Sequence, residues 1–345
     1  MRYRYPSECS LRSDFQPVYT PRSSNAPTSE ARRKRSATEP KWHNKMKVLV
    51  LGATGFIGLP ISQALVRAGH EVYGLVRTDE KAKLLRKEEI IPIIGDASNP
   101  TYLSLIATLD CVISTLATSA EIARVTFDTI VATASDTRPP SAPKLNYIFS
   151  SGTWIHGDDR TTLVSDTTPI TNPVSLLAGW LPELESHIIR NRSAQLNALV
   201  IRPSLVYGRA GSNFAPLFAA AKAGKVIWPG TPGGRYALVH VDDVADAYVR
   251  AAERASILGG KTIDVSNAQT ESVDELLRRL VEVSGARGPY EYRKPENSFE
   301  EAVSSSAILR PYLAHALLDW HPKKASFTDG LETYYAAWEA ATQAE

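Results

Sequence analysis

From Lys47 onward, short apolar blocks alternate with longer stretches that mix polar and apolar residues. The block Lys47–Leu51 holds branched apolar residues without alternation, which is typical of a strand buried on both faces. The following stretch, Ile57–Ala68, predicts a helix that ends at Gly69, and Glu71–Arg77 predicts a second strand. The same order continues with strands at Ile90–Asp96 and Cys111–Ala117 and helices at Pro100–Leu109 and Ser119–Asp136. This alternation predicts an α/β chain with a doubly wound parallel sheet, the Rossmann fold.

A glycine-rich turn joins the first strand to the first helix. Gly52, Gly55 and Gly58 stand three residues apart, where side chains would block the bend, the approach of a pyrophosphate and the packing of helix on strand. The helix start offers free N–H groups and a positive dipole end to an anion. We therefore expect a dinucleotide here, held by Gly52, Thr54, Gly55, Phe56, Ile57 and Gly58.

The first 45 residues differ from the rest of the chain in composition. They are rich in Ser, Pro and Arg, lack periodicity, and carry ten Lys and Arg against four Asp and Glu, which predicts a disordered basic tail. The whole chain has a net charge of +2, so the part after the tail is slightly acidic. We therefore expect no nucleic-acid binding by the core.

Hydrophobic residues make up 43% and charged residues 22% of the chain, and no apolar run approaches the roughly 18 residues of a membrane span. We expect a protein without a membrane partner. Cys9 and Cys111 are too few for a disulfide framework and lack metal-ligand spacing. Cysteine usage therefore predicts a reducing, cytoplasmic location and no metal site.

The glycine spacing after Lys-Val-Leu-Val-Leu resembles the short-chain dehydrogenase/reductase superfamily, and Gly-Ala-Thr-Gly-Phe-Ile-Gly resembles its extended, epimerase/dehydratase-like branch. Asn146–Gly152 and Ile201–Gly208 resemble the fifth and sixth strands of that family, and Val239–Ala245 resembles the segment that returns to the cofactor domain. The resemblance implies a dinucleotide-binding domain over 46–208, rejoined by 236–267, and a smaller C-terminal substrate lobe over 209–345.

The second strand ends in Arg77, where NAD-binding relatives place an acid that binds the ribose. A guanidinium pairs with the 2′-phosphate of NADP, and Lys81 lies one helical turn further on. We therefore expect NADP, while Asp79 leaves NAD open. The resemblance adds Asp96 as an adenine contact, with a capping role as the alternative, and Leu116 and Ala117 complete the expected cofactor site.

Typical members of the superfamily carry a Tyr-x-x-x-Lys pair on the helix after the fifth strand, and this chain lacks it there. Aligning Glu185 with the acid that often follows the pair puts Leu177 and Leu181 in the two positions. Pro182 is expected to restart the helix and break the register. The literal match Tyr290–Lys294 lies in a predicted late strand, where it would not form the pair.

Other residues must then supply the proton. Ser151 and Thr153 flank Gly152, which takes the position of the catalytic serine of the family. His156 stands where the pattern has Tyr, and its imidazole titrates in the useful range, although a hydrogen-bonded loop histidine is the alternative. Tyr207 follows the sixth strand and has a structural role as its alternative.

These patterns predict an NADPH-dependent oxidoreductase or epimerase that acts on a small organic or nucleotide-sugar substrate. Two other interpretations stay open: a cofactor-binding regulator that resembles the nitrogen-metabolite repressor-like proteins, and a non-redox isomerase or lyase. The long helices Ser119–Asp136 and Pro182–Ala194 occupy positions through which many relatives pair, so a homodimer also stays open.

Overall fold

A computed structural model describes residues 45–97, 99–116, 118–209, 212–324 and 326–343. The predicted tail, apart from Lys45, lies outside these residues, as does Ala117. No helix in the described ranges is both long and apolar enough to cross a membrane.

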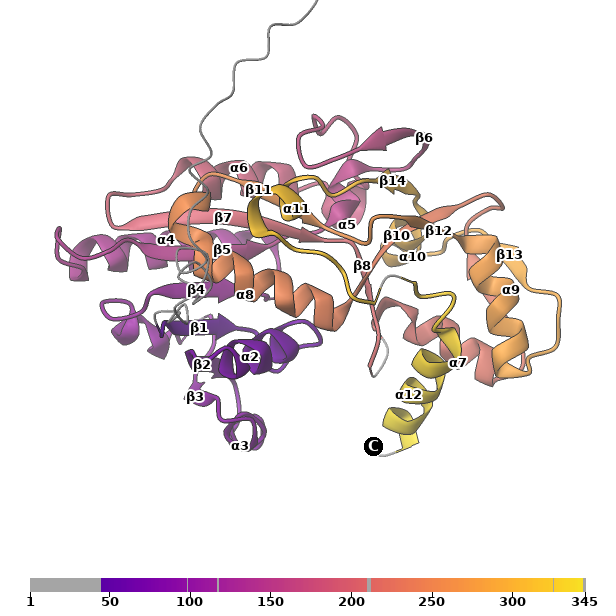
Figure 1. The fold of residues 1–345 in the computed structure, drawn as a ribbon, viewed down its shortest axis with the longest axis horizontal. Coiled ribbons are helices and arrows are strands. Elements are labelled where there is room, and N and C mark those ends of the chain that lie inside the picture. Colours follow the sequence, from indigo (N-terminus) through magenta and orange to yellow (C-terminus); the bar gives the residue numbers. More distant parts are fainter. Residues whose placement is uncertain (1–44, 98, 117, 210–211, 325, 344–345) are drawn as a thin grey trace, which may run out of the picture. The chain divides into compact units, whose positions relative to one another are not determined.

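Among the described residues, seven parallel strands form a central sheet in the order β11-β7-β5-β4-β1-β2-β3 (Figure 1). Its first strand pairs on both sides, with Val48 opposite Val72 and Cys111. The chain therefore winds outward from β1 in both directions, and the doubly wound fold is confirmed. The strands are β1 Lys47–Leu51, β2 Glu71–Val76, β3 Ile91–Ile94, β4 Cys111–Ser114, β5 Leu145–Ser150, β7 Leu196–Pro203 and β11 Thr262–Val265.

Helices cover both faces of this sheet. One apolar cluster joins α2, α8 and α11 to the sheet, and a second joins α4 and α6 to the other side chains of the same strands. Strands with two covered faces need apolar residues at every position, which explains the unbroken block at Val48–Leu51, all of it buried. The helices packed on the sheet are α2 Gly58–Arg67, α3 Asp79–Lys87, α4 Ala120–Thr137, α6 Leu181–Arg190, α8 Val241–Leu258 and α11 Leu313–Leu318.

A smaller lobe has its own apolar cluster, rich in aromatic rings such as Phe214, Trp228 and Phe327. Its helix α9 is capped at the N-terminus by Ser272, whose Oγ accepts the N–H of Glu275, and at the C-terminus by Gly285 in the left-handed conformation. The remaining strands are β6 Asp159–Val164, β8 Leu205–Tyr207, β9 Ile227–Pro229, β10 Arg235–His240, β12 Thr270–Ser272, β13 Glu291–Arg293 and β14 Ala307–Leu309. The remaining helices are α5 Ser175–Ala178, α7 Ala215–Lys222, α9 Val273–Ser284, α10 Ser298–Ser304 and α12 Leu331–Gln343, with short 3-10 turns η1 Thr101–Leu105, η2 Thr153–His156 and η3 Ser212–Phe214.

Three predicted elements need correction. The strand expected at Ile201–Gly208 divides at Ser204, because β7 stays in the central sheet while β8 pairs with β10. The stretch Phe299–Leu318, which the sequence also predicts to be helical, divides into α10, β14 and α11. Pro311 explains why α10 and α11 are not continuous, since proline is excluded from a helix interior. The helix expected at Pro100–Leu109 is only the short turn η1.

Candidate functional site

The turn between β1 and α2 is built on its glycines. Gly52 has a φ of +87°, a backbone conformation that side chains disfavour. The N–H of Gly55 bonds to the carbonyl oxygen of Gly52 at 2.9 Å. A Cβ on Gly58 would lie 2.1 Å from that same oxygen, so helix and turn approach each other as closely as backbone allows. The predicted need for glycine at these positions agrees with the geometry.

A cavity of about 540 Å³ opens beside this turn, at the carboxyl ends of the strands. Arg77 and Lys81 line it on the β2–α3 side. Asp96 lines it after β3, and its Oδ1 also accepts the N–H of Asn99 at 2.8 Å, which is the capping contact that was its alternative role. Several of the expected cofactor residues line this cavity, namely Gly52, Thr54, Gly55, Arg77, Lys81, Asp96 and Leu116.

These side chains fit a nicotinamide dinucleotide. Glycine backbone and the N-terminus of α2 suit a pyrophosphate, a carboxylate suits hydroxyl or amino donors, and the two cations suit an additional phosphate. Phe56 and Ile57 contact the apolar core behind the turn, and Ile57 also lines a neighbouring cavity.

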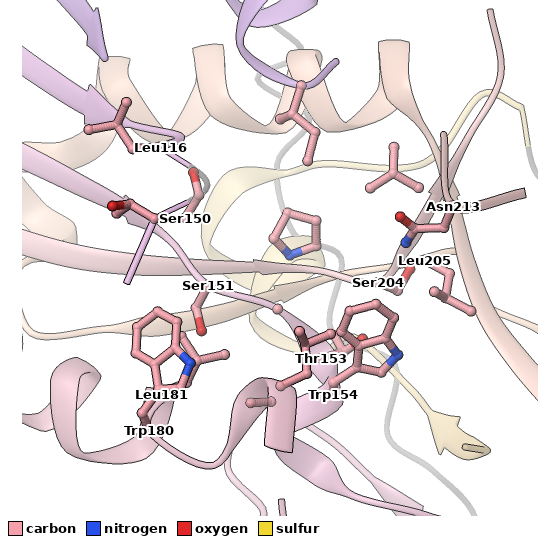
Figure 2. A pocket seen from close by; sticks show the side chains of 17 residues that line it. Leu116, Ser150, Ser151, Thr153, Trp154, Trp180, Leu181, Ser204, Leu205 and Asn213 are labelled. Carbon is pink, nitrogen blue, oxygen red and sulfur yellow. The ribbon is translucent and has the colours of Figure 1, made fainter. Parts of the chain in front are cut away.

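Figure 2 shows that second cavity, which has a volume of about 570 Å³. It shares Leu116 and Thr118 with the first, so the two adjoin. Its described lining is apolar or carries neutral hydroxyl, amide and indole groups, and includes no Asp, Glu, Lys, Arg, His, Cys or Tyr. Its apolar and aromatic walls include Trp180 and Leu181 on one side and Trp154 and Leu205 on the other (Figure 2), and Leu177 also lines it.

Two of the predicted catalytic residues, Ser151 and Thr153, line this second cavity. The Oγ of Ser151 is buried and has no hydrogen-bond partner among the described residues. Neighbouring Ser150 differs, because its Oγ accepts the phenol of Tyr248 at 2.6 Å. Burial raises the pKa of that phenol, so Tyr248 holds its proton and fixes Ser150 instead of acting as an acid.

The structure places His156 away from this lining. Its side chain is buried, and its Nε2 lies 2.8 Å from Oδ2 of Asp264, a fully buried carboxylate on β11. Because this contact occupies the imidazole within the protein, the geometry favours the loop-histidine interpretation over the predicted proton donor. His156 instead links η2 to β11.

Asp264 also contacts Arg202, which in turn binds Glu185 on helix α6. Asp264 Oδ1 lies 3.6 Å from Nη1 of Arg202, and Arg202 also binds Glu185 through Nε and Nη2, at 3.0 and 2.5 Å. Burial opposes the charged form of Arg202, but the hydrogen bonds and charges of Glu185 and Asp264 outweigh it and raise its pKa. We call His156, Asp264, Arg202 and Glu185 the buried charge network.

Tyr207 also lies away from the cavity. Its phenol donates to the carbonyl oxygen of Lys324 at 2.5 Å, and its ring packs on Phe327 and Tyr334. Burial raises the pKa of this phenol far above neutral. The predicted catalytic role of Tyr207 therefore gives way to its alternative, a structural one.

The structure also lacks a Tyr and Lys pair at the positions that the alignment assigns to it. Leu177 and Leu181 both line the second cavity, so apolar side chains stand where the alignment puts the pair. The helix also breaks as expected, since α5 ends at Ala178 and α6 restarts with Pro182 in its first turn. Tyr290 does not line this cavity, and its phenol donates a hydrogen bond to Oδ1 of Asp274 at 3.0 Å.

Sequence reasoning missed six polar or aromatic residues of the second cavity: Thr118, Ser150, Trp154, Trp180, Ser204 and Asn213. Ser150 and Ser204 lie inside the segments that resemble the fifth and sixth strands of the family, and Trp154 follows the first of these segments by two residues, so position alone could have indicated them. Asn213 begins the lobe, and Trp180 lies in the turn between two helices, where no motif marks them.

Comparisons with known proteins agree with this geometry. Residues 48–266 match the model of the NAD dependent epimerase/dehydratase family. The chain is 26% identical to a 4-hydroxy-2-methyl-3-oxo-4-farnesyl-3,4-dihydroquinoline-1-oxide ketoreductase of Stigmatella aurantiaca, over 70% of this chain and 74% of the relative. It is 28% identical to a UDP-glucose 4-epimerase of Mycolicibacterium smegmatis, over 72% and 86%. A Bacillus anthracis dTDP-glucose 4,6-dehydratase in complex with NAD shares the fold, with a TM-score of 0.71 and 14% identity over 86% of this chain and 98% of that one.

Proposed function

Because the chain belongs to the NAD dependent epimerase/dehydratase family, and is an oxidoreductase- or epimerase-like enzyme, we propose that it uses NADPH to reduce the carbonyl group of an uncharged, largely apolar small molecule. The observation that carries this proposal is the lining of the second cavity. Apolar walls with a few neutral hydroxyls suit a hydrocarbon body with a carbonyl group.

The same lining argues against a nucleotide sugar. A diphosphate is held in proteins by Arg, Lys or clustered N–H donors, and neither Arg nor Lys occurs among the described residues of this cavity. The name of the ketoreductase relative denotes a ketone that carries a farnesyl group, a long hydrocarbon chain, in keeping with this choice. The UDP-glucose epimerase relative represents the alternative substrate class, which the experiment below includes.

The proposed chemistry needs little from titratable side chains. NADPH, held by the β1–α2 turn, Arg77 and Lys81, would supply the hydride for the carbonyl carbon when bound. Ser151 donates a hydrogen bond to the carbonyl oxygen, with Thr153 as the alternative donor, and a water molecule in the cavity gives that oxygen its proton and leaves as hydroxide. Leu177, Leu181 and Trp180 exclude bulk water, which strengthens that hydrogen bond in the transition state.

The experiment measures NADPH consumption by the purified full chain with unbranched methyl ketones, cyclic enones and UDP-sugars, and product analysis accompanies each assay. We expect turnover of the ketones and none of the UDP-sugars. Ser151→Ala should lower kcat by about 10²-fold, the usual effect of removing one donor to a developing oxyanion.

Ser135→Ala, on the exposed face of α4, is the matched control and should leave kcat unchanged. Turnover of UDP-sugars alone would contradict the proposed substrate class. Tight NADPH binding without turnover of any compound would contradict catalysis and favour the regulator interpretation.

Arg77 should select the cofactor. A charge-assisted contact is worth roughly 1.5–3 kcal/mol, so Arg77→Ala should weaken NADPH binding by about 10- to 150-fold and NADH binding much less. Titration by nicotinamide fluorescence measures both dissociation constants. Arg67→Ala, an exposed arginine at the end of α2 and outside the cavity lining, is the control. Equal affinity of the unaltered protein for NADPH and NADH would refute this assignment.

A further inference from the structure

Two buried hydroxyls in the second cavity lack a partner. The Oγ atoms of Ser151 and Ser204 are both inaccessible to solvent and have no hydrogen-bond partner among the described residues, and both residues line the cavity. Ser204 is only 5% exposed as a whole. Ser150 shows the contrast, because Tyr248 satisfies its hydroxyl. Buried polar groups without partners are rare in folded proteins and are costly to keep.

The two hydroxyls stand at different ends of the cavity. Figure 2 shows Ser151 on the side of Trp180 and Leu181, and Ser204 on the side of Leu205 and Asn213. Backbone contacts fix both residues: the N–H of Ser151 bonds to Ile201, and the N–H of Ser204 bonds to Val265. The two residues therefore stay at their separate positions in the cavity unless one of these backbone hydrogen bonds breaks.

We infer that the substrate carries two oxygen functions, the reacting carbonyl at Ser151 and a second oxygen at Ser204, joined by an apolar segment that lies between them. This inference rests on the proposed function, and it names the class of compound that the cavity selects. A monofunctional ketone would leave the Ser204 hydroxyl buried and unpaired in the complex. A compound with a second acceptor at the right distance would pair it, once the hydroxyl turns about its Cα–Cβ bond toward the cavity.

The test compares 2-octanone with the series from octane-2,4-dione to octane-2,7-dione, at saturating NADPH. We expect one dione to exceed 2-octanone in kcat/KM by about 10-fold or more. Ser204→Ala should abolish that advantage, mainly through KM. Ser151→Ala should lower kcat for both compounds. Ser135→Ala again serves as the matched control.

A stability measurement separates this role from a structural one. Replacing a hydroxyl that has no partner removes an unfavourable buried group, so Ser204→Ala should leave the Tm of the ligand-free protein unchanged or raise it. A fall of several degrees would show that the hydroxyl has a partner in the free protein and would overturn the inference. Weaker NADPH binding by Ser204→Ala would overturn it too, because the hydroxyl would then serve the cofactor.

Binding measured by calorimetry in the presence of NADPH keeps the two proposals distinguishable. If the diones bind more tightly than 2-octanone but none is reduced, the two-point recognition stands and the proposed reaction fails. If ketones are reduced but no dione exceeds 2-octanone, the proposed reaction stands and the two-point recognition fails.

Discussion

Arg202→Met is expected to lower the free energy of unfolding by about 3–5 kcal/mol, because it removes the arginine that pairs with two buried carboxylates, Glu185 and Asp264. Glu185 is 4% exposed and Asp264 is fully buried, so neither recovers its lost partner by hydration. Chemical denaturation followed by tryptophan fluorescence measures the change. The same substitution should loosen α6, which places Leu181 at the cavity.

Arg86→Met is the matched control for that measurement. Arg86 lies on α3 and its Nη1 is 3.5 Å from Asp79, with both side chains more than half exposed. Exposed pairs of this kind are worth about 0–1 kcal/mol, and Met is as good a helix former as Arg. Equal losses of stability in the two variants would show that the buried charge network does not stabilise this part of the fold.

The β1–α2–β2 unit illustrates what the sequence predicts well. Its strands are buried on both faces and need apolar residues, and its turn needs glycine for steric reasons. The residues that the fold requires there are therefore the ones that the sequence pattern shows directly. The family inferred from Met46–Gly58 is confirmed by the match over 48–266. A homodimer, a cytoplasmic location and the preference for NADP remain predictions.

His156 illustrates what the sequence could not predict. Its position at a strand end suggested the cleft, but its orientation depends on Asp264, which lies 108 positions further along the chain. Such a partner becomes visible only when β11 takes its place beside β7. The apolar replacement of the Tyr and Lys positions by Leu177 and Leu181, in contrast, follows from local alignment, and both side chains do lie at the cavity.

Gly58→Ala is expected to weaken binding of either dinucleotide by about 10²-fold or more. The added Cβ would lie 2.1 Å from the carbonyl oxygen of Gly52 and 2.8 Å from Oγ1 of Thr115. These atoms belong to the turn and to the segment after β4, which form the wall of the cofactor cavity. Relief of the clash must move that wall by about 1 Å, a displacement that typically costs a positioned ligand of this order. Fluorescence titration with NADPH and NADH measures the loss.

Gly69→Ala separates this steric effect from the general cost of replacing glycine. Gly69 follows α2 with a φ of +89°, and a Cβ there would meet no atom within 4 Å. Its substitution should lower stability by about 1–2 kcal/mol through backbone strain and leave both dissociation constants unchanged. If Gly58→Ala bound NADPH as tightly as Gly69→Ala does, the dinucleotide would not depend on the β1–α2 turn, and the cofactor site would have to lie elsewhere.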